Sequence, residues 1–423
     1  MKGAYLYKAP RGTTDILPAE QGYFRYIEER AADICQCYGY KRIDTPLFED
    51  SRLFVRTIGP GTDIVEKETY SFEDRSGQGM TLRPEGTAPI CRAYLEHGMH
   101  NLPQPVKLYY FAAIFRYERP QKGRYRQHQQ FGFEALGEGD PALDAEVIEM
   151  AWRFFKSLGL RKISMKVNSI GCRLCRPPYL EKLTEYYTEH IEQMCPECKA
   201  RFRKNTLRLL DCKKPLCQDT AAGAPKSVQH LCPECKEHFK SVSSYLRLLR
   251  VPYKKDHRLV RGLDYYTRTV FEVQPKDEGG AQSALGGGGR YDDLIGELGG
   301  KPTPAIGFAT GIERIVLNLK EQGIKPPVSD AQGIYVAYLG HEGKAEAVKL
   351  TAELRRAGML VHWSFGNKSL KSQMRQANAL GAEFAFIFGE DEVRNGTVMY
   401  RDLVEGEQWE VSIDEVVNLL TQV

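Results

Sequence analysis

Two strand-like segments on either side of a short basic stretch constrain the fold of this chain more than any other feature. Residues 107–117 and 127–136 have the alternating apolar and polar pattern of β-strands. The polar stretch between them, residues 118–126, is rich in arginine and lysine. We therefore expect an antiparallel hairpin whose connecting loop is long and basic.

The remainder of the first 325 residues mixes helices and strands without regular alternation. Helical periodicity marks residues 21–38, 140–158 and 312–319, whereas β-branched and aromatic residues favour a strand at 265–273. Strict alternation would be typical of a parallel sheet, and it is missing here. The sequence thus predicts an α+β fold, with helices flanking an antiparallel sheet.

The pattern changes after a proline-rich stretch at residues 325–330, which we interpret as a linker. Beyond it, apolar strand patterns at 333–339, 359–365 and 384–388 alternate with helical patterns at 344–356 and 368–380. Such alternation predicts a small parallel or mixed α/β domain at the C-terminus.

Composition narrows the class of protein. The chain has 423 residues, 42% of them hydrophobic, and its mean hydropathy is −0.45. No apolar run approaches the roughly 18 residues that a membrane helix needs, and the N-terminus lacks the apolar core of a secretion signal. We expect no membrane span and a cytoplasmic location.

Eight of the eleven cysteines fall between residues 172 and 235. Within residues 195–260, 15 Lys and Arg stand against 6 Asp and Glu, so this region is strongly basic although the net charge of the chain is only +4. The region also interrupts the strand pattern, which resumes near residue 259. We predict a catalytic domain in two parts, 1–171 and 251–325, a cysteine-rich insertion at 172–250, and a C-terminal domain at 326–423.

The spacing of these cysteines suggests a metal site. Two identical Cys-Pro-Glu-Cys turns supply Cys195, Cys198, Cys232 and Cys235, which we predict to close one structural Zn²⁺ site. A possible second set is Cys172, Cys175, Cys212 and Cys217. Four thiolates leave no open coordination position, so the metal would support folding only. The alternative is that these cysteines are small buried apolar residues without metal.

The hairpin is the strongest candidate for a functional site. Gln130, Gly132 and Glu134 share one face of the second strand, and the missing side chain of Gly132 leaves room for a ligand over the sheet. Arginines at the end of the first strand and in the loop suit phosphate binding. Neither a Walker phosphate-binding loop nor the motifs of zinc proteases and serine hydrolases occur in the sequence.

Six segments together resemble the histidyl-tRNA synthetase family of class II aminoacyl-tRNA synthetases. Residues 39–46, 115–127 and 305–314 are similar to class II motifs 1, 2 and 3. Residues 259–272 and 284–294 are similar to the two histidine-specific segments of the family, and residues 81–87 to the loop that binds the amino group of histidine. The resemblance runs from residue 11 into the C-terminal domain, and only the cysteine-rich insertion departs from the usual form.

The resemblance implies a six-stranded antiparallel sheet, an anticodon-binding C-terminal domain, and a homodimer joined through motif 1. The implied substrates are L-histidine, ATP with Mg²⁺, and tRNA(His). The implied histidine-binding residues are Glu85, Gly86, Thr87, Gln130, Glu134, Tyr265 and Tyr266. Arg261 and Arg116 would be catalytic, and ATP would contact Arg116, Glu118 and Arg314, while the tRNA acceptor end would contact Arg119 and Gln121.

Two other functions fit parts of the sequence. A regulatory subunit of ATP phosphoribosyltransferase shares the catalytic fold, but it could dispense with the catalytic arginine, the basic loop and the anticodon domain, all of which have counterparts here. A zinc-bearing nucleic-acid-binding protein would explain the basic insertion but not Glu85, Gln130 and Glu134. Threonyl- and prolyl-tRNA synthetases share the architecture without the histidine-specific segment.

Overall fold

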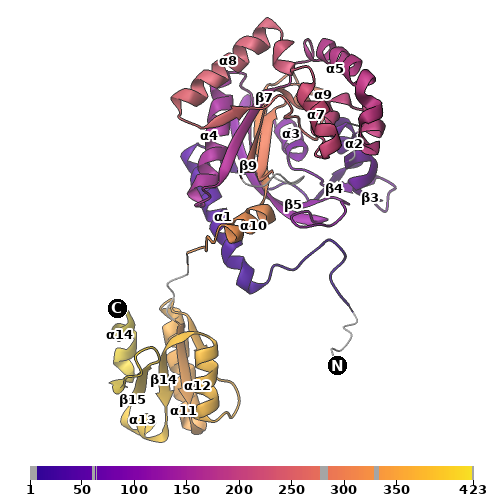
Figure 1. Cartoon of the computed structure of the whole chain (residues 1–423). Coiled ribbons are helices and arrows are strands. Elements are labelled where there is room, and N and C mark those ends of the chain that lie inside the picture. The colour runs from indigo at the N-terminus through magenta and orange to yellow at the C-terminus, as the bar shows by residue number, and fades with distance from the viewer. Residues whose placement is uncertain (1–6, 60–61, 63, 277–283, 328–332, 422–423) are drawn as a thin grey trace. The chain divides into compact units, whose positions relative to one another are not determined.

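The computed structural model describes residues 7–59, 62, 64–276, 284–327 and 333–421. The chain divides into two compact units, Met1–Pro327 and Val328–Val423 (Figure 1). The second half of the proposed linker, residues 328–330, lies outside the described residues. No helix in the described part of the chain combines the length and apolar character that crossing a membrane requires.

The first unit is built on an eight-stranded sheet with the order β1-β5-β6-β11-β10-β9-β7-β8. Its six inner strands are all antiparallel, as the resemblance implies, and the short edge strands β1 and β8 pair parallel to their neighbours. The strands are β1 (Lys41–Arg42), β5 (Val106–Phe115), β6 (Gln127–Leu136), β7 (Ile163–Ser169), β8 (Tyr253–Lys255), β9 (Thr267–Pro275), β10 (Gly286–Arg290) and β11 (Ala305–Gly311). The predicted hairpin is the β5–β6 pair.

The two faces of this sheet have different environments because side chains alternate along each strand. On β6, Phe131 and Phe133 point into an apolar core shared with helices, whereas Gln130 and Glu134 point to the opposite face. The helices of that core are α1 (Pro18–Cys37), α4 (Pro141–Ser157), α8 (Pro233–Leu248) and α10 (Ile312–Glu321). The other face carries a second apolar core, and the polar positions of β6 lie on that face.

A second, three-stranded sheet is formed by strands within residues 48–82. It has the order β2-β4-β3 and comprises β2 (Phe48–Asp50), β4 (Gly79–Leu82) and β3 (Tyr70–Glu73). Helix α2 (Ser51–Ile58) packs against this sheet, and α2 in turn contacts a π-helical turn at Ile64–Glu68, α3 (Thr87–Glu96) and α9 (Leu294–Glu297). This sheet leads the chain directly into α3, whose first residues belong to the candidate site.

The cysteine-rich insertion is helical and leaves the large sheet after β7. It contains α5 (Arg176–His190), α6 (Pro196–Phe202), a 3₁₀ turn at Thr206–Leu209, and α7 (Pro215–Gly223). Helix α8 then returns the chain along α4 to β8, which pairs with β7. The insertion therefore begins and ends beside the same strand.

The second unit has a five-stranded mixed sheet with the order β13-β12-β14-β15-β16. Its strands are β12 (Gly333–Tyr338), β13 (Val361–Trp363), β14 (Ala382–Phe388), β15 (Thr397–Asp402) and β16 (Gln408–Ser412). The helices are α11 (Gly340–Arg356), α12 (Leu370–Ala379), α13 (Glu390–Asn395) and α14 (Val416–Thr421). Strands β12, β13 and β14 run parallel to one another, whereas β15 pairs antiparallel with both β14 and β16. The expectation of a small parallel or mixed α/β domain is thus confirmed, and the sheet is mixed.

Candidate active site

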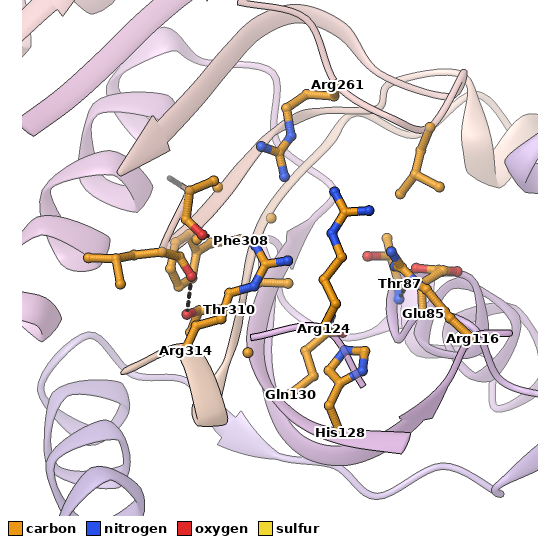
Figure 2. A pocket seen from close by; sticks show the side chains of 18 of the residues that line it. Glu85, Thr87, Arg116, Arg124, His128, Gln130, Arg261, Phe308, Thr310 and Arg314 are labelled. Atoms are coloured by element: carbon orange, nitrogen blue, oxygen red, sulfur yellow. Dashed lines mark hydrogen bonds between the residues drawn. The ribbon is translucent and has the colours of Figure 1, made fainter. Parts of the chain in front are cut away.

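A polar cavity of about 180 Å³ lies on the face of the large sheet opposite the core formed with α1, α4, α8 and α10 (Figure 2). It is lined by the start of α3, the loop between β5 and β6, and strands β6, β10 and β11. The sequence-predicted residues that line it are Glu85, Thr87, Arg116, Glu118, Gln130, Glu134, Arg261, Tyr265, Tyr266 and Arg314. Gly86 lies between two of them, whereas Arg119 and Gln121 are exposed and lie outside the lining.

One end of the cavity is formed by the N-terminus of α3. The carboxylate of Glu85 accepts hydrogen bonds from the backbone N–H groups of Thr87 at 2.6 Å and Ala88 at 2.8 Å. These N–H groups have no partner within the helix, so the carboxylate caps α3. Burial raises the pKa of Glu85, and the two hydrogen bonds act in the opposite direction.

Glu134 lies beside this end with both carboxyl oxygens in use. Thr87 donates from Oγ1 to Oε1 at 2.8 Å, and Tyr291 donates from its hydroxyl to Oε2 at 2.5 Å. Burial raises the pKa of Glu134 to about 8, and these hydrogen bonds oppose the shift. Burial thus favours the protonated form of this carboxyl, and a nearby cationic ligand would favour the charged carboxylate.

The space above Gly132 is filled by the protein itself, so the expectation that it leaves room for a ligand is wrong. Tyr110 stands opposite Gly132 in the β5–β6 register, and a side chain at Gly132 or Gly86 would overlap its ring and hydroxyl. The hydroxyl of Tyr110 donates to Oε1 of Gln130 at 3.0 Å. The glycine accommodates a tyrosine that fixes the orientation of the Gln130 amide.

Two adjacent tyrosines form an aromatic wall. The rings of Tyr265 and Tyr266 are 4.8 Å apart, and Tyr291 packs edge-on against Tyr265 at 5.7 Å. Burial raises the pKa of both Tyr265 and Tyr266, so their hydroxyls remain protonated donors. A ligand here would meet ring faces together with phenolic and carboxyl groups.

The other end of the cavity is cationic. Figure 2 shows Arg261, Arg124 and Arg314 pointing toward one another from different elements. Arg314 is held by Nε donating to the carbonyl of Gly123 at 3.0 Å and by Nη1 donating to that of Ala284 at 3.0 Å. Burial lowers the pKa of Arg314, and Arg124 and Arg116 lower it further. This mutual repulsion makes an anion favourable among the arginines.

The motif 2 arginines are fixed by the hairpin. Arg116 donates from Nε to the carbonyl of Pro84 at 2.7 Å, which ties the end of β5 to the loop before α3. Arg124 forms an ion pair with Glu118 at 3.1 Å. His128 stays neutral beside them, because burial together with Arg116 and Arg314 lowers its pKa to about 3. The cluster thus has fixed positive charges that no histidine protonation alters near neutral pH.

Sequence reasoning missed several lining or supporting residues, namely Arg124, His128, Tyr110, Tyr291, Glu272 and Thr310. Arg124 was part of the predicted basic loop, and Tyr291 and Glu272 lie in the two histidine-specific segments. Nothing in the sequence marked them individually, because their roles depend on which strands are neighbours in the sheet.

The cysteines form two clusters, and their grouping corrects the sequence prediction. Cys172, Cys175, Cys232 and Cys235 lie together, here called the root cluster, and Cys195, Cys198, Cys212 and Cys217 form the internal cluster. The predicted site of Cys195, Cys198, Cys232 and Cys235 does not form. Each Cys-Pro-Glu-Cys turn starts a different helix, α6 or α8, and each pairs with the cysteines nearest to its own helix.

An antiparallel six-stranded core with a carboxyl end and an arginine end in one cavity is the architecture expected of a class II aminoacyl-tRNA synthetase. The family model for histidyl-tRNA synthetase matches residues 12–174 and 188–315, and an anticodon-binding-domain model matches residues 333–423. The chain therefore belongs to the histidyl-tRNA synthetase family. The match covers most of the insertion and leaves out residues 175–187.

Individual relatives support the same assignment. A histidine–tRNA ligase of Dehalococcoides mccartyi is 56% identical over 412 residues, which cover 97% of this chain and 98% of that protein. The apo histidyl-tRNA synthetase of S. aureus has a TM-score of 0.82 at 37% identity, covering 98% of this chain and 99% of that one.

A third protein shares the fold alone. A structure from Bacillus halodurans titled as an ATP phosphoribosyltransferase regulatory subunit/histidyl-tRNA synthetase has a TM-score of 0.64 at 22% identity, covering 91% of this chain and 98% of that one. Fold similarity therefore does not separate the enzyme from a regulatory subunit, whereas the close sequence relatives are ligases.

Proposed function

We propose that this chain activates L-histidine with ATP and transfers it to the 3′ end of tRNA(His). Histidine would occupy the carboxyl and tyrosine end of the cavity, and the ATP phosphates the arginine end. The observation that carries the proposal is the separation of these two environments within a single cavity that also contains Arg261 and Glu134.

The histidine end offers both kinds of partner that the substrate needs. The ammonium group requires acceptors, which Glu85, Glu134 and Thr87 provide. The imidazole has one donor and one acceptor nitrogen. If an isostere of histidine lacks one of these nitrogens, a buried phenol or carboxyl of the site is left without a hydrogen-bond partner, and the isostere is rejected. Tyr265 and Tyr266 are well placed for this discrimination.

In the first step, a histidine carboxylate oxygen attacks the α-phosphorus of ATP, an O–P bond forms, and the bond to pyrophosphate breaks. No protein nucleophile is required. The arginines would hold the phosphates in line and offset the negative charge that develops on the phosphoryl oxygens. In the second step, a hydroxyl of the terminal ribose of tRNA attacks the histidyl carbonyl and AMP leaves.

Mg²⁺ would share the charge of the phosphates. It is usually held by one or two carboxylates together with substrate phosphates. Glu118 is a carboxylate that lines the cavity between Arg116 and Arg124, and it is the residue that would hold the ion together with the phosphates. We also propose a homodimer joined through motif 1, residues 39–46, and a cytoplasmic location.

Pyrophosphate exchange tests the assignment. With ATP and each of the 20 standard amino acids in turn, exchange should occur with L-histidine alone. Equal exchange with threonine or proline would make the chain another class II synthetase. Histidine binding without any exchange would instead favour a regulatory subunit.

A further inference from the structure

We propose that the insertion holds two structural zinc ions, one in the root cluster and one in the internal cluster, and that the root ion positions the tyrosine wall of the histidine end. The two-ion assignment stands on the cysteine geometry alone. The division of effects between the two ions rests on the proposed function.

The sulfur positions fit single tetrahedral ions. In the root cluster, Sγ of Cys172 is 3.8 Å from that of Cys175 and 3.9 Å from that of Cys232. In the internal cluster, Cys195 and Cys212 are 3.9 Å apart, and in both clusters all four sulfurs lie within 4.8 Å of one another. A Zn–S distance of about 2.3 Å gives a tetrahedron edge of about 3.8 Å. A disulfide would need about 2 Å.

Neighbouring groups suit thiolate ligands. Cys232 is the N-cap of α8, where the helix dipole favours negative charge. The backbone N–H of Cys195 donates to Sγ of Cys217 at 3.3 Å, and that of Cys172 donates to Sγ of Cys175 at 3.3 Å. Hydrogen bonds of this kind orient ligands and stabilise their charge around a metal.

Each cluster closes a long loop. The root cluster joins two turns that are 60 residues apart in sequence, at the points where the chain leaves β7 and where α8 begins. The internal cluster joins α6, the segment after Leu209, and α7. Metal binding would offset the entropy of closing these loops, so the ions would contribute directly to folding of the insertion.

The root cluster is connected to the histidine end through Arg176, the residue after Cys175. Cys175 is the N-cap of α5, and the next residue, Arg176, donates from Nη2 to the carbonyl oxygen of Tyr266. On the other side of the cluster, Gly171 accepts from the backbone N–H of Arg268 at 2.9 Å. Gly171 and Arg176, which flank the first two cysteines of the root cluster, therefore hold both ends of the short segment Tyr266 to Arg268. Tyr266 lines the cavity.

The internal cluster is connected to a different region. The segment between Cys198 and Cys212 contributes Arg201, Asn205 and Arg208 to a second cavity of about 230 Å³, which Arg116 and Arg124 also line. Asn205 donates to Asp264 at 2.9 Å, which fixes this segment against the catalytic domain. An ion in the internal cluster would thus order a basic wall beside motif 2, where a polyanion would approach.

Metal content of the full-length protein, purified without chelator, tests the two-ion assignment. We expect two zinc ions per chain, both released when the eight thiols are titrated with a mercurial. Protein grown with cobalt should show the intense visible bands of tetrahedral tetrathiolate Co²⁺ at two equivalents. Fewer than about 1.5 equivalents of metal, or a spectrum without those bands, would overturn the proposal. These measurements use the wild-type chain, so a negative result cannot be attributed to misfolding of a variant.

Two serine variants assign the ions to their effects. Cys235→Ser should retain one zinc and raise KM for histidine in pyrophosphate exchange about tenfold, with kcat changed much less. Cys217→Ser should also retain one zinc, leave exchange near wild type, and raise KM for tRNA about tenfold. The exposed Cys37, outside both clusters, gives the matched control Cys37→Ser, which should keep two ions and full activity.

Other outcomes are equally informative. Loss of both ions in either variant would contradict two independent sites, and an unchanged KM for histidine in Cys235→Ser would contradict the link through Arg176. Absence of exchange in the wild type would reject the proposed function without affecting the metal count, so the two failures are distinguishable.

Discussion

The guanidinium of Arg261 donates from Nη1 to Oε2 of Glu272 at 2.9 Å, directly over a glycine that a larger residue could not replace. A Cβ at Gly287 would lie 2.5 Å from that nitrogen and 2.7 Å from the carbonyl oxygen of Phe271. Arg261 lines the cavity, so its pair with Glu272 fixes a guanidinium that a ligand in the cavity would meet.

Arg261→Ala should reduce pyrophosphate exchange by at least about a hundredfold, because one preorganised charge facing the reacting phosphate is lost. Histidine binding should weaken much less, and Arg261→Lys should restore part of the rate. Arg258→Ala is the matched control, because Arg258 pairs with Asp256 and does not line the cavity. An effect confined to KM would show that Arg261 only binds substrate.

Tyr110→Phe should raise KM for histidine severalfold with a smaller change in KM for ATP. The substitution removes the hydroxyl that orients the Gln130 amide but keeps the ring that fills the space above Gly132. Tyr109→Phe, on the opposite face of β5, should have no such effect. Amino-acid-dependent exchange kinetics measure both variants, and equal losses for the two would assign the effect to general packing of the hairpin.

The large-scale fold was accessible from the sequence because it depends on local patterns. The β5–β6 hairpin, α4 and the alternating C-terminal unit follow from periodicity over ten or more residues. The parallel edge strands β1 and β8 could not be predicted in this way, because strands of two or three residues carry no periodic signal. Tyr110 was missed for a related reason, since only the cross-strand register places it over Gly132.

The grouping of the cysteines was beyond sequence reasoning for another physical reason. Two identical Cys-Pro-Glu-Cys turns favoured a single shared site, but ligand pairing depends on where helices begin in space. The start of α8 lies beside the end of β7, because β8 pairs with β7 after α8 returns. Cys232 and Cys235 therefore meet Cys172 and Cys175.

Glu134 should make folding stability pH-dependent. Its pKa is raised to about 8 by burial in the folded protein, whereas an unfolded chain ionises the group near pH 4.5. Between these values the folded state binds more protons than the unfolded state, so stability falls as pH rises from about 4.5 to about 8. In Glu134→Gln this contribution should vanish.

Urea unfolding of both proteins at pH 5.5 and pH 8 measures the difference. The loss of unfolding free energy between the two pH values should be larger for wild type than for Glu134→Gln, with each unit of pKa shift corresponding to about 1.4 kcal/mol. Equal losses would mean that Glu134 is ionised in the folded protein at neutral pH. Saturating histidine should reduce the difference, because its ammonium favours the charged carboxylate.

The exposed tip of the motif 2 hairpin should act on tRNA and not on ATP. Gln121 and Arg124 exchange backbone hydrogen bonds at 3.3 and 2.8 Å, which forms a tight turn that presents the Gln121 side chain to solvent outside the cavity. Gln121→Ala should therefore lower kcat/KM for tRNA about tenfold or more and leave pyrophosphate exchange nearly unchanged, as expected when contacts to a nucleic-acid end are lost. Gln36→Ala, an exposed glutamine on α1, serves as control. Equal losses in aminoacylation and exchange would instead place Gln121 in the adenylation step, which would require the tip to fold inward over the arginines when ATP binds.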